Sequence, residues 1–342
     1  MSGLISINHS MLHILDFISC QNTFASQEMD MGQKSAKHYV ERLCKKTLED
    51  LDAKRGQFAQ GSTFAQVMTD YFVDEASFSQ TSTQIAQFFA SQLSYMEKPQ
   101  STDVLVVDFS QNQTDAELEQ RYLGIILLES KQAYMHESGW TEQGPCNTVT
   151  KQLSVLPSPA NKISSYALVN LRSLEVRFQD KPRVISGQEC LLIPELLLQC
   201  SVEASTKEAF CAVTELVEEV AAEYGANTAV VLSQAKTAAK EAVMTEGELD
   251  LDSLADEVFG QNEPMAARFK EEASNRQMPT RVAMEPKAVE RISRNHKIVT
   301  DTGIEITFPA EYSKSPEYIT FSSGADGMIS IELKNITHIE NR

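Results

Sequence analysis

The sequence predicts an α+β fold with an N-terminal antiparallel sheet and helices, an acidic helical middle, and a small C-terminal β-hairpin unit. Between residues 104 and 178, β-rich apolar stretches follow one another without helices between them, which favours antiparallel over parallel pairing. Helical spacing of apolar residues dominates the middle, and hairpin turn signals return at the end. We therefore expect three regions: an α+β domain over 1–200, an acidic helical region over 201–284, and a basic helix with two β-hairpins over 285–342.

The elements of the N-terminal region follow from the spacing of its apolar residues. An apolar stretch over 4–15 predicts a first strand, or a strand followed by a short helix. Helical periodicity predicts three helices, over 33–54, 63–73 and 82–96. Strand-like stretches then predict four strands, over 104–109, 122–128, 148–155 and 166–178.

A helical zone is expected from about Glu189. Ser205 and Glu208 form a capping-box pattern, in which a hydroxyl accepts from a first-turn amide and the glutamate reaches back. The helix that they open has apolar residues at helical spacing and ends at Gly225. The middle continues with three more helices, over 228–244, over 250–259, and one with Pro264 in its first turn.

The last region begins with a helix from Pro286 to about residue 295. Two turn signals follow, at 301–303 and 324–327, and each is flanked by apolar residues at strand spacing. We expect two linked hairpins that form one small sheet, with Val289 and Ile292 of the helix covering one of its faces.

Charge is unevenly distributed along the chain. The 342 residues include 30 Lys+Arg and 48 Asp+Glu, a formal net charge of -18, and residues 201–290 hold 8 basic and 18 acidic residues. Between Arg276 and Lys297 the sign changes, because six basic residues face two acidic ones. If the protein touches nucleic acid directly, this basic segment is the expected place. If it does not, its acidity suits basic protein partners.

The predicted helix of the basic segment gathers its charges on one side. Three basic residues spaced four and three apart share a helix face and are flanked by one more on each side: Lys287, Arg291 and Arg294, with Arg281 and Lys297. Such residues neutralise backbone phosphates and do not read sequence. No aromatic residues are interleaved, so base stacking is not suggested. The other interpretation is a charged helix face that is simply solvated.

Several function classes lack their sequence signals. No run of about 18 apolar residues predicts a membrane span, and the N-terminus lacks the basic start of a signal peptide. The six cysteines show no CxxC spacing, which suits buried thiols in a reducing cytosol. Glycine motifs for phosphate are absent. His9 and His13 would align on a helix, but without a nearby glutamate or cysteine motif they do not predict a zinc site. We expect no cofactor, metal or catalytic residue.

One set of residues suggests an enzyme as an alternative. Asp108 lies at the end of one apolar strand, and Glu129 and Lys131 end the next. A carboxylate on one strand and glutamate-x-lysine on its neighbour is how many metal-dependent nucleases hold a divalent ion. Charged residues at strand ends are more often solvated, so a metal-dependent nuclease is the minor alternative.

The order of the segments is itself informative. Diffuse patterns occur along most of the chain: Ile5-Ser-Ile-Asn-His9, Tyr122-Leu-Gly-Ile-Ile-Leu-Leu128, Ile193-Pro-Glu-Leu-Leu-Leu198, Glu248-Leu-Asp-Leu-Asp-Ser-Leu-Ala255 and Gly303-Ile-Glu-Ile-Thr-Phe308. In this order the chain resembles the NdpA family of bacterial nucleoid-associated proteins. The resemblance implies a cytoplasmic protein of the nucleoid without known enzyme chemistry, and it supplies no binding residues.

These observations predict a non-enzymatic nucleoid-associated protein. It would bind DNA non-specifically, or reach the bacterial chromosome through DNA-acting protein partners. The alternative is an interaction protein whose acidic helices bind basic partners or mimic the charge of DNA, through four glutamates: Glu215, Glu218, Glu219 and Glu223. No membrane partner is expected. The oligomeric state stays open and is compatible with a dimer.

Overall fold

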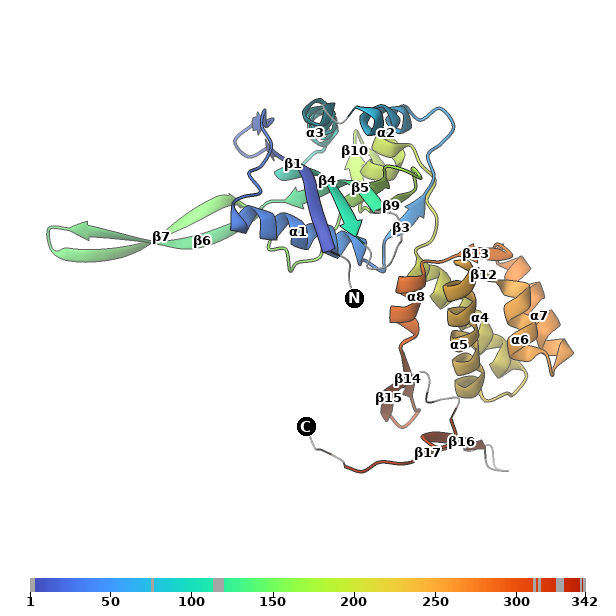
Figure 1. Cartoon of the computed structure of the whole chain (residues 1–342). Coiled ribbons are helices and arrows are strands. Elements are labelled where there is room, and N and C mark those ends of the chain that lie inside the picture. The colour runs from blue at the N-terminus through green and yellow to red at the C-terminus, as the bar shows by residue number, and fades with distance from the viewer. Residues whose placement is uncertain are drawn as a thin grey trace. The chain divides into compact units, whose positions relative to one another are not determined.

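The chain folds into two compact units, Met1–Glu203 and Ala204–Arg342. The computed structural model describes residues 4–74, 77–112, 120–309, 312, 315–323, 329–338 and 340. Figure 1 shows the helices and strands along the chain. Within these described ranges, no helix is both long and apolar enough to cross a membrane.

An antiparallel sheet forms the centre of the first unit, with its described strands in the order β2-β1-β4-β5-β8-β9-β3. The strands are β1 (Leu4–Asp16), β2 (Gln21–Thr23), β3 (Lys54–Gly56), β4 (Thr102–Asn112), β5 (Gln120–Glu129), β8 (Tyr166–Asn170) and β9 (Val176–Gln179). Every neighbouring pair is antiparallel, which confirms the α+β prediction. The middle strands β4, β5 and β8 are mostly buried, which explains their near-continuous apolar sequences.

Helices cover both faces of this sheet. On one face lies α1 (Lys34–Leu48), whose Val40 and Leu43 belong to the same buried cluster as Leu105 and Val107 of β4. Because side chains alternate along a strand, the residues between them serve the opposite face. That face is covered by three elements: α2 (Thr63–Val73), α3 (Phe78–Ser94) and the π-helical segment η2 (Leu192–Leu198).

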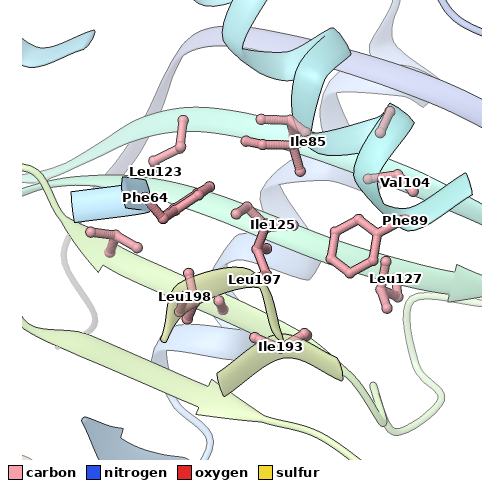
Figure 2. Close-up of a cluster of buried hydrophobic side chains, with 14 of the residues drawn as sticks. Phe64, Ile85, Phe89, Val104, Leu123, Ile125, Leu127, Ile193, Leu197 and Leu198 are labelled. Carbon is pink, nitrogen blue, oxygen red and sulfur yellow. The ribbon is translucent and has the colours of Figure 1, made fainter. Parts of the chain in front are cut away.

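Figure 2 shows the core on this second face. Phe64 of α2 and Phe89 of α3 lie over Ile125 and Leu127 of β5, and Leu197 of η2 completes the cluster. Phe89 is completely buried. Truncating such a side chain to alanine typically costs about 3–5 kcal/mol, so this core is a main source of the unit's stability.

Most predicted elements of this unit occur within a few residues of their expected positions. The first apolar stretch is a single strand throughout, β1, with no helix after it. The helix expected over 33–54 ends earlier, at Leu48, because Lys54–Gly56 pair with β9 as the edge strand β3.

The helical zone expected from about Glu189 begins three residues later, with η2 at Leu192, and its first α-helix begins at Thr206. Glu189 itself lies in a hairpin formed by β10 (Pro182–Ile185) and β11 (Gln188–Leu191). Ser186 and Gly187 connect the two strands with positive φ angles of 51° and 80°. This is the two-residue connection that favours a tightly twisted hairpin, so a turn and not a helix start is encoded here.

A second hairpin projects from the first unit. Its first strand, β6 (Lys131–Thr141), follows β5 after one residue, and β7 (Gly144–Val155) returns antiparallel to it. The two strands form a separate two-stranded sheet that extends away from the main sheet (Figure 1).

The second unit is helical. Its helices are α4 (Thr206–Glu223), α5 (Thr228–Glu246), α6 (Leu251–Phe259), α7 (Glu263–Asn275) and α8 (Pro286–Ser293). The capping box is confirmed, because Ser205 Oγ accepts from the Glu208 amide at 3.0 Å and the Glu208 carboxylate accepts from the Ser205 amide at 2.9 Å. A short ladder of β12 (Glu248–Asp250) and β13 (Arg281–Ala283) leads the chain back toward α8.

Two hairpins follow α8, as the turn signals predict. They are β14 (Asn295–Val299) with β15 (Glu305–Pro309), and β16 (Ile319–Ser323) with β17 (Ile329–Leu333). The turn expected at 324–327 lies outside the described residues. Among the strands that the structure describes, the hairpins form two separate sheets, so the prediction of one small sheet is wrong. The Phe308 and Phe321 rings, with centroids 6.5 Å apart, connect them instead.

The helix α8 does not cover these hairpins as expected. Val289 is completely buried in the core formed by α4 to α7, and Ile292 packs against the same core. The other helices of the unit offer a larger apolar surface than a two-stranded sheet. The apolar side of α8 therefore turns toward them.

Candidate nucleic-acid interface

The helix α8 has one buried side and one charged side. Pro286 occupies its first turn, where a missing amide hydrogen is tolerated. Ala288 and Val289 are buried against the other helices. The basic residues at the predicted spacing, Lys287, Arg291 and Arg294, are all exposed. The predicted helix face therefore exists as a solvent-accessible surface.

Within the described chain, two of these three cations have no carboxylate partner. Neither Lys287 nor Arg294 is in an ion pair with any described residue. Glu290, which is also exposed, borders the same face and lowers its net charge. Arg291 lies in the last turn and Arg294 is the C-cap residue, at the end of the helix where the dipole favours positive charge. This local stabilisation is a structural reason for their position that needs no DNA.

The flanking cations are already balanced by carboxylates. Arg281 lies 2.8 Å from Glu248 and 3.5 Å from Asp250 across the β12–β13 ladder. Lys297 lies 2.9 Å from Glu305 on the neighbouring strand. Exposed pairs of this kind contribute about 0–1 kcal/mol to stability. They nevertheless reduce the positive charge that these two residues present to a partner.

The acidic alternative surface is partly neutralised in the same way. All four candidate glutamates of α4 are exposed. Glu219 pairs with Arg276, and Glu223 lies 3.1 Å from Arg268. Arg276, the first residue of the basic segment, is therefore paired with carboxylates of the acidic helices, and its charge is partly neutralised.

The nuclease set is not brought together. Asp108 pairs with Leu123 across β4 and β5, whereas Glu129 pairs with Thr102 six residues farther along β4. That separation is about 20 Å at the rise of a β-strand. Asp108 lies inside β4, which continues to Asn112, whereas Glu129 is the last residue of β5 and lies beside the first residue of β4. Asp108, Glu129 and Lys131 therefore do not form one metal site.

The two acidic members of that set have structural partners instead. Asp108 is completely buried, and Arg121 donates to its two oxygens at 2.9 and 2.6 Å. The Tyr71 hydroxyl also donates to it, and burial together with this carboxylate raises the pKa of Tyr71. Glu129 forms an ion pair with Lys181, with 2.5 Å between Oε1 and Nζ.

The histidine pair also has a structural role. His9 and His13 lie on the strand β1 and not on a helix. His13 Nδ1 accepts from the Ala25 amide at 3.1 Å, so Nε2 carries the proton and donates to Ser82 Oγ at 2.8 Å. Burial lowers the pKa of His13. In the described ranges, no group of three or more His, Cys, Asp or Glu side chains is placed to hold a metal ion.

Comparison with known proteins identifies the family of this chain. A family model described as "NA37: Nucleoid-associated protein YejK" matches residues 11–338, nearly the whole chain. The chain belongs to this family. A search of curated proteins finds no match. The resemblance to bacterial nucleoid-associated proteins, drawn from diffuse segments of the sequence, is thereby confirmed.

In this YejK-family chain, one cation lies close to the end of α8 without any signal in the sequence. Lys236 of α5 lies near His296, which follows α8 and is almost completely buried. Burial, and to a smaller extent the Lys236 charge, lowers the pKa of His296 to about 4. A lysine among alanines on a packed helix gives no signal of this proximity in the sequence.

The cysteines of this YejK-family chain are all free. Cys44 is buried, and burial raises its pKa, but Cys20 and Cys146 are exposed. The expectation of buried thiols is therefore wrong for Cys20 and Cys146. Cys20 lies in the turn before β2, and Cys146 lies on the projecting β6–β7 hairpin, where no core is available to cover it.

Proposed function

We propose that this YejK-family protein acts without catalysis in the bacterial cytoplasm and binds the nucleoid by direct, sequence-independent contact with DNA phosphates. The contact surface is the exposed face of α8, formed by Lys287, Arg291 and Arg294. The observation that carries the proposal is the exposure of all three on one helix face, while the opposite side of the helix is buried.

The balance of charge within this surface supports the assignment. Lys287 and Arg294 are in no ion pair among the described residues, so a phosphate displaces no bound carboxylate there, although Glu290 lowers the net charge of the face. Arg281 and Lys297 belong to the same surface in the proposal, but each must first leave a carboxylate. We therefore assign the larger share of binding to the α8 face and a smaller share to these two flanking residues.

The overall charge sets the expected strength. A chain with a formal net charge of -18 is repelled by DNA at long range. A local face with three cations offsets this only at short range. Binding should therefore be weak and should fall steeply as salt rises, since each phosphate contact releases a condensed counterion.

A salt titration tests the proposal. We would measure binding of the full chain to a short fluorescent DNA duplex by anisotropy, at several potassium chloride concentrations. Replacing Lys287, Arg291 and Arg294 together by alanine should lower the log–log salt slope by roughly one unit for each lost contact. The matched control removes three exposed cations of the first unit that have no ion pair among the described residues: Lys34, Arg42 and Lys98.

The control separates a local contact from a general charge effect. Both triple variants change the net charge equally, so an equal loss of binding would contradict a specific α8 surface. An absence of binding by the wild-type chain at low salt would overturn direct contact. In that case the route through DNA-acting protein partners would be the explanation of nucleoid association.

The acidic-surface alternative receives less support. Two of its four glutamates, Glu219 and Glu223, are neutralised by arginines of the second unit. Capturing a basic, DNA-bound partner would therefore depend on Glu215 and Glu218. Replacing these two by glutamine should leave DNA binding unchanged under the direct-contact proposal, and it should weaken partner capture under the alternative.

A further inference from the structure

The hairpin of β6 and β7 lacks the packing that stabilises the rest of the first unit. Its strands pair with each other along their length, and in the described chain neither adds to another sheet. It projects away from the main sheet (Figure 1). An isolated two-stranded hairpin is at best marginally stable in water. A partner that covers one of its faces would therefore stabilise it.

The two faces of the hairpin differ strongly. Residues directly opposite each other in an antiparallel pair share a face. One face, here called the aromatic face, consists of four cross-strand pairs: Tyr134 with Lys151, His136 with Val149, Ser138 with Asn147, and Trp140 with Pro145. The opposite face consists of smaller and more polar pairs: Met135 with Thr150, Glu137 with Thr148, and Gly139 with Cys146.

The aromatic face is exposed to solvent. The relative exposures are 83% for Trp140, 74% for Tyr134 and 67% for Val149. Trp140 is the single tryptophan of the chain. Tyr134 and Trp140 lie six residues apart on β6, toward the two ends of this face, and Val149 lies between them. Exposed aromatic side chains are enriched in protein–protein interfaces, where they supply much of the binding energy.

The charge of the hairpin argues against DNA as its partner. Its strands and turn, residues 131–155, contain two lysines and two glutamates and therefore have no net charge. A segment without excess positive charge neutralises no phosphates. The same neutrality allows close approach of another copy of this chain, because the repulsion expected from a net charge of -18 is absent locally.

The pattern of the aromatic face is complementary to itself. A two-fold axis between the His136 and Ser138 pairs would place the Trp140 pair of one copy against the Tyr134 and Lys151 pair of the other. Aromatic rings and a lysine ammonium attract each other in such contacts. The same axis places His136 and Val149 against the small polar pair in the centre, so large side chains meet small ones.

We propose that the aromatic face of the β6–β7 hairpin is a dimerisation surface that binds the same face of a second copy of this chain. The strands have 11 and 12 residues. At the rise of a β-strand the hairpin is about 35 Å long. Covering one face would bury roughly 500–700 Å² per copy, near the 800 Å² per partner of a standard interface. Two-fold contacts of this isologous kind are the commonest in homo-oligomers.

The single tryptophan makes the interface directly observable. Sedimentation equilibrium of the full wild-type chain should show a monomer–dimer equilibrium at micromolar concentration. Over the same concentration range, Trp140 emission should move to shorter wavelength as its ring leaves water. Neither measurement requires a variant, so a failure of an altered hairpin to fold does not affect this arm.

Paired variants test which face is used. Replacing Tyr134 and Trp140 by serine should raise the dimer dissociation constant at least about tenfold. The matched control replaces Met135 and Cys146 on the opposite face by serine and should leave it unchanged. Circular dichroism and thermal unfolding of both variants would report whether the fold is retained.

Several results would overturn the proposal. These are a wild-type chain that stays monomeric at high micromolar concentration, a dimer whose Trp140 emission stays that of an exposed ring, and an equal loss of dimer in both variants. A shift of Trp140 emission when duplex DNA is added to a monomeric chain would assign the hairpin to DNA instead.

Discussion

The charged residues inside the first unit and those on α8 of the second are balanced in different ways. In the first unit, Asp180 and Arg183 are at most 4% exposed at their side chains and lie 2.6 Å apart. On α8, Lys287 and Arg294 are exposed and have no ion pair within the described chain. Removing charges from water without partners is costly, so buried groups must be matched. Exposed groups escape this requirement and remain available for an external anion.

The Asp180–Arg183 pair tests the buried half of this comparison most strongly. Asp180 accepts from Arg183 and from the Ile193 amide at 2.7 Å. The change Asp180→Asn leaves the Arg183 guanidinium buried with a weaker partner. We expect a loss of about 3–5 kcal/mol in unfolding free energy, measured by urea denaturation. The exposed pair supplies the control, since Glu223→Gln should cost less than about 1 kcal/mol. Similar costs at both sites would contradict the distinction.

The second buried pair should respond in a graded way. Arg121→Leu removes the main partner of the completely buried Asp108, and we expect a loss of about 3 kcal/mol, measured by urea denaturation. Tyr71→Phe removes one hydroxyl donor to the same carboxylate and should cost about 1–2 kcal/mol. Neither change should alter DNA binding, because both lie outside the α8 surface. A larger effect for Tyr71→Phe than for Arg121→Leu would reverse the assignment of the main partner.

A third buried carboxylate, that of Asp103, is in no ion pair with any residue that the structure describes, and its stability contribution should depend on pH. Asp103 is 6% exposed, and its Oδ1 has no hydrogen-bond partner among the described residues. Burial, and then the charge of Asp16, raises the pKa of Asp103 from 3.8 to about 6. The folded state therefore holds this proton more tightly than the unfolded state, and stability is lost as pH rises from about 4 to 6.

The change Asp103→Asn removes this titration. The stability of the variant relative to wild type should rise by about 2–3 kcal/mol between pH 4 and pH 7, following 1.36 kcal/mol per pKa unit. Urea denaturation of both proteins at matched pH values measures the difference, and other groups cancel in it. A difference that does not change with pH would show that Asp103 stays ionised in the folded protein.

The sequence predicted local elements better than pairings. The Ser205 capping box and the start of α8 at Pro286 are encoded within a few residues, so the chain alone reveals them. The charges on α8 also followed from helical spacing. Partnerships such as Arg121 with Asp108 depend on strand register, which nearby residues do not specify.

The nuclease hypothesis shows the same limit. The sequence suggested that Asp108 and Glu129 both end apolar strands and that these ends meet. In the structure Asp108 lies inside β4, which continues to Asn112, and the antiparallel register places Glu129 beside Thr102 at the start of that strand. The projecting hairpin was missed as a surface for a related reason. Alternating residues predict a strand, but the absence of a covering element appears only once the sheet is assembled.

The smallest expected effect compares a paired with an unpaired cation in the second unit. Arg294→Ala should lower the salt slope of DNA binding by about one unit, since no described carboxylate competes for this residue. Arg281→Ala should lower it less, because Arg281 already lies against Glu248 and Asp250. In unfolding free energy the order should reverse, with a loss of up to about 1 kcal/mol for Arg281→Ala and about 0.5 kcal/mol or less for Arg294→Ala. Equal salt slopes for the two variants would show that pairing with a carboxylate does not limit access to phosphate, and the flanking residues would then belong fully to the interface.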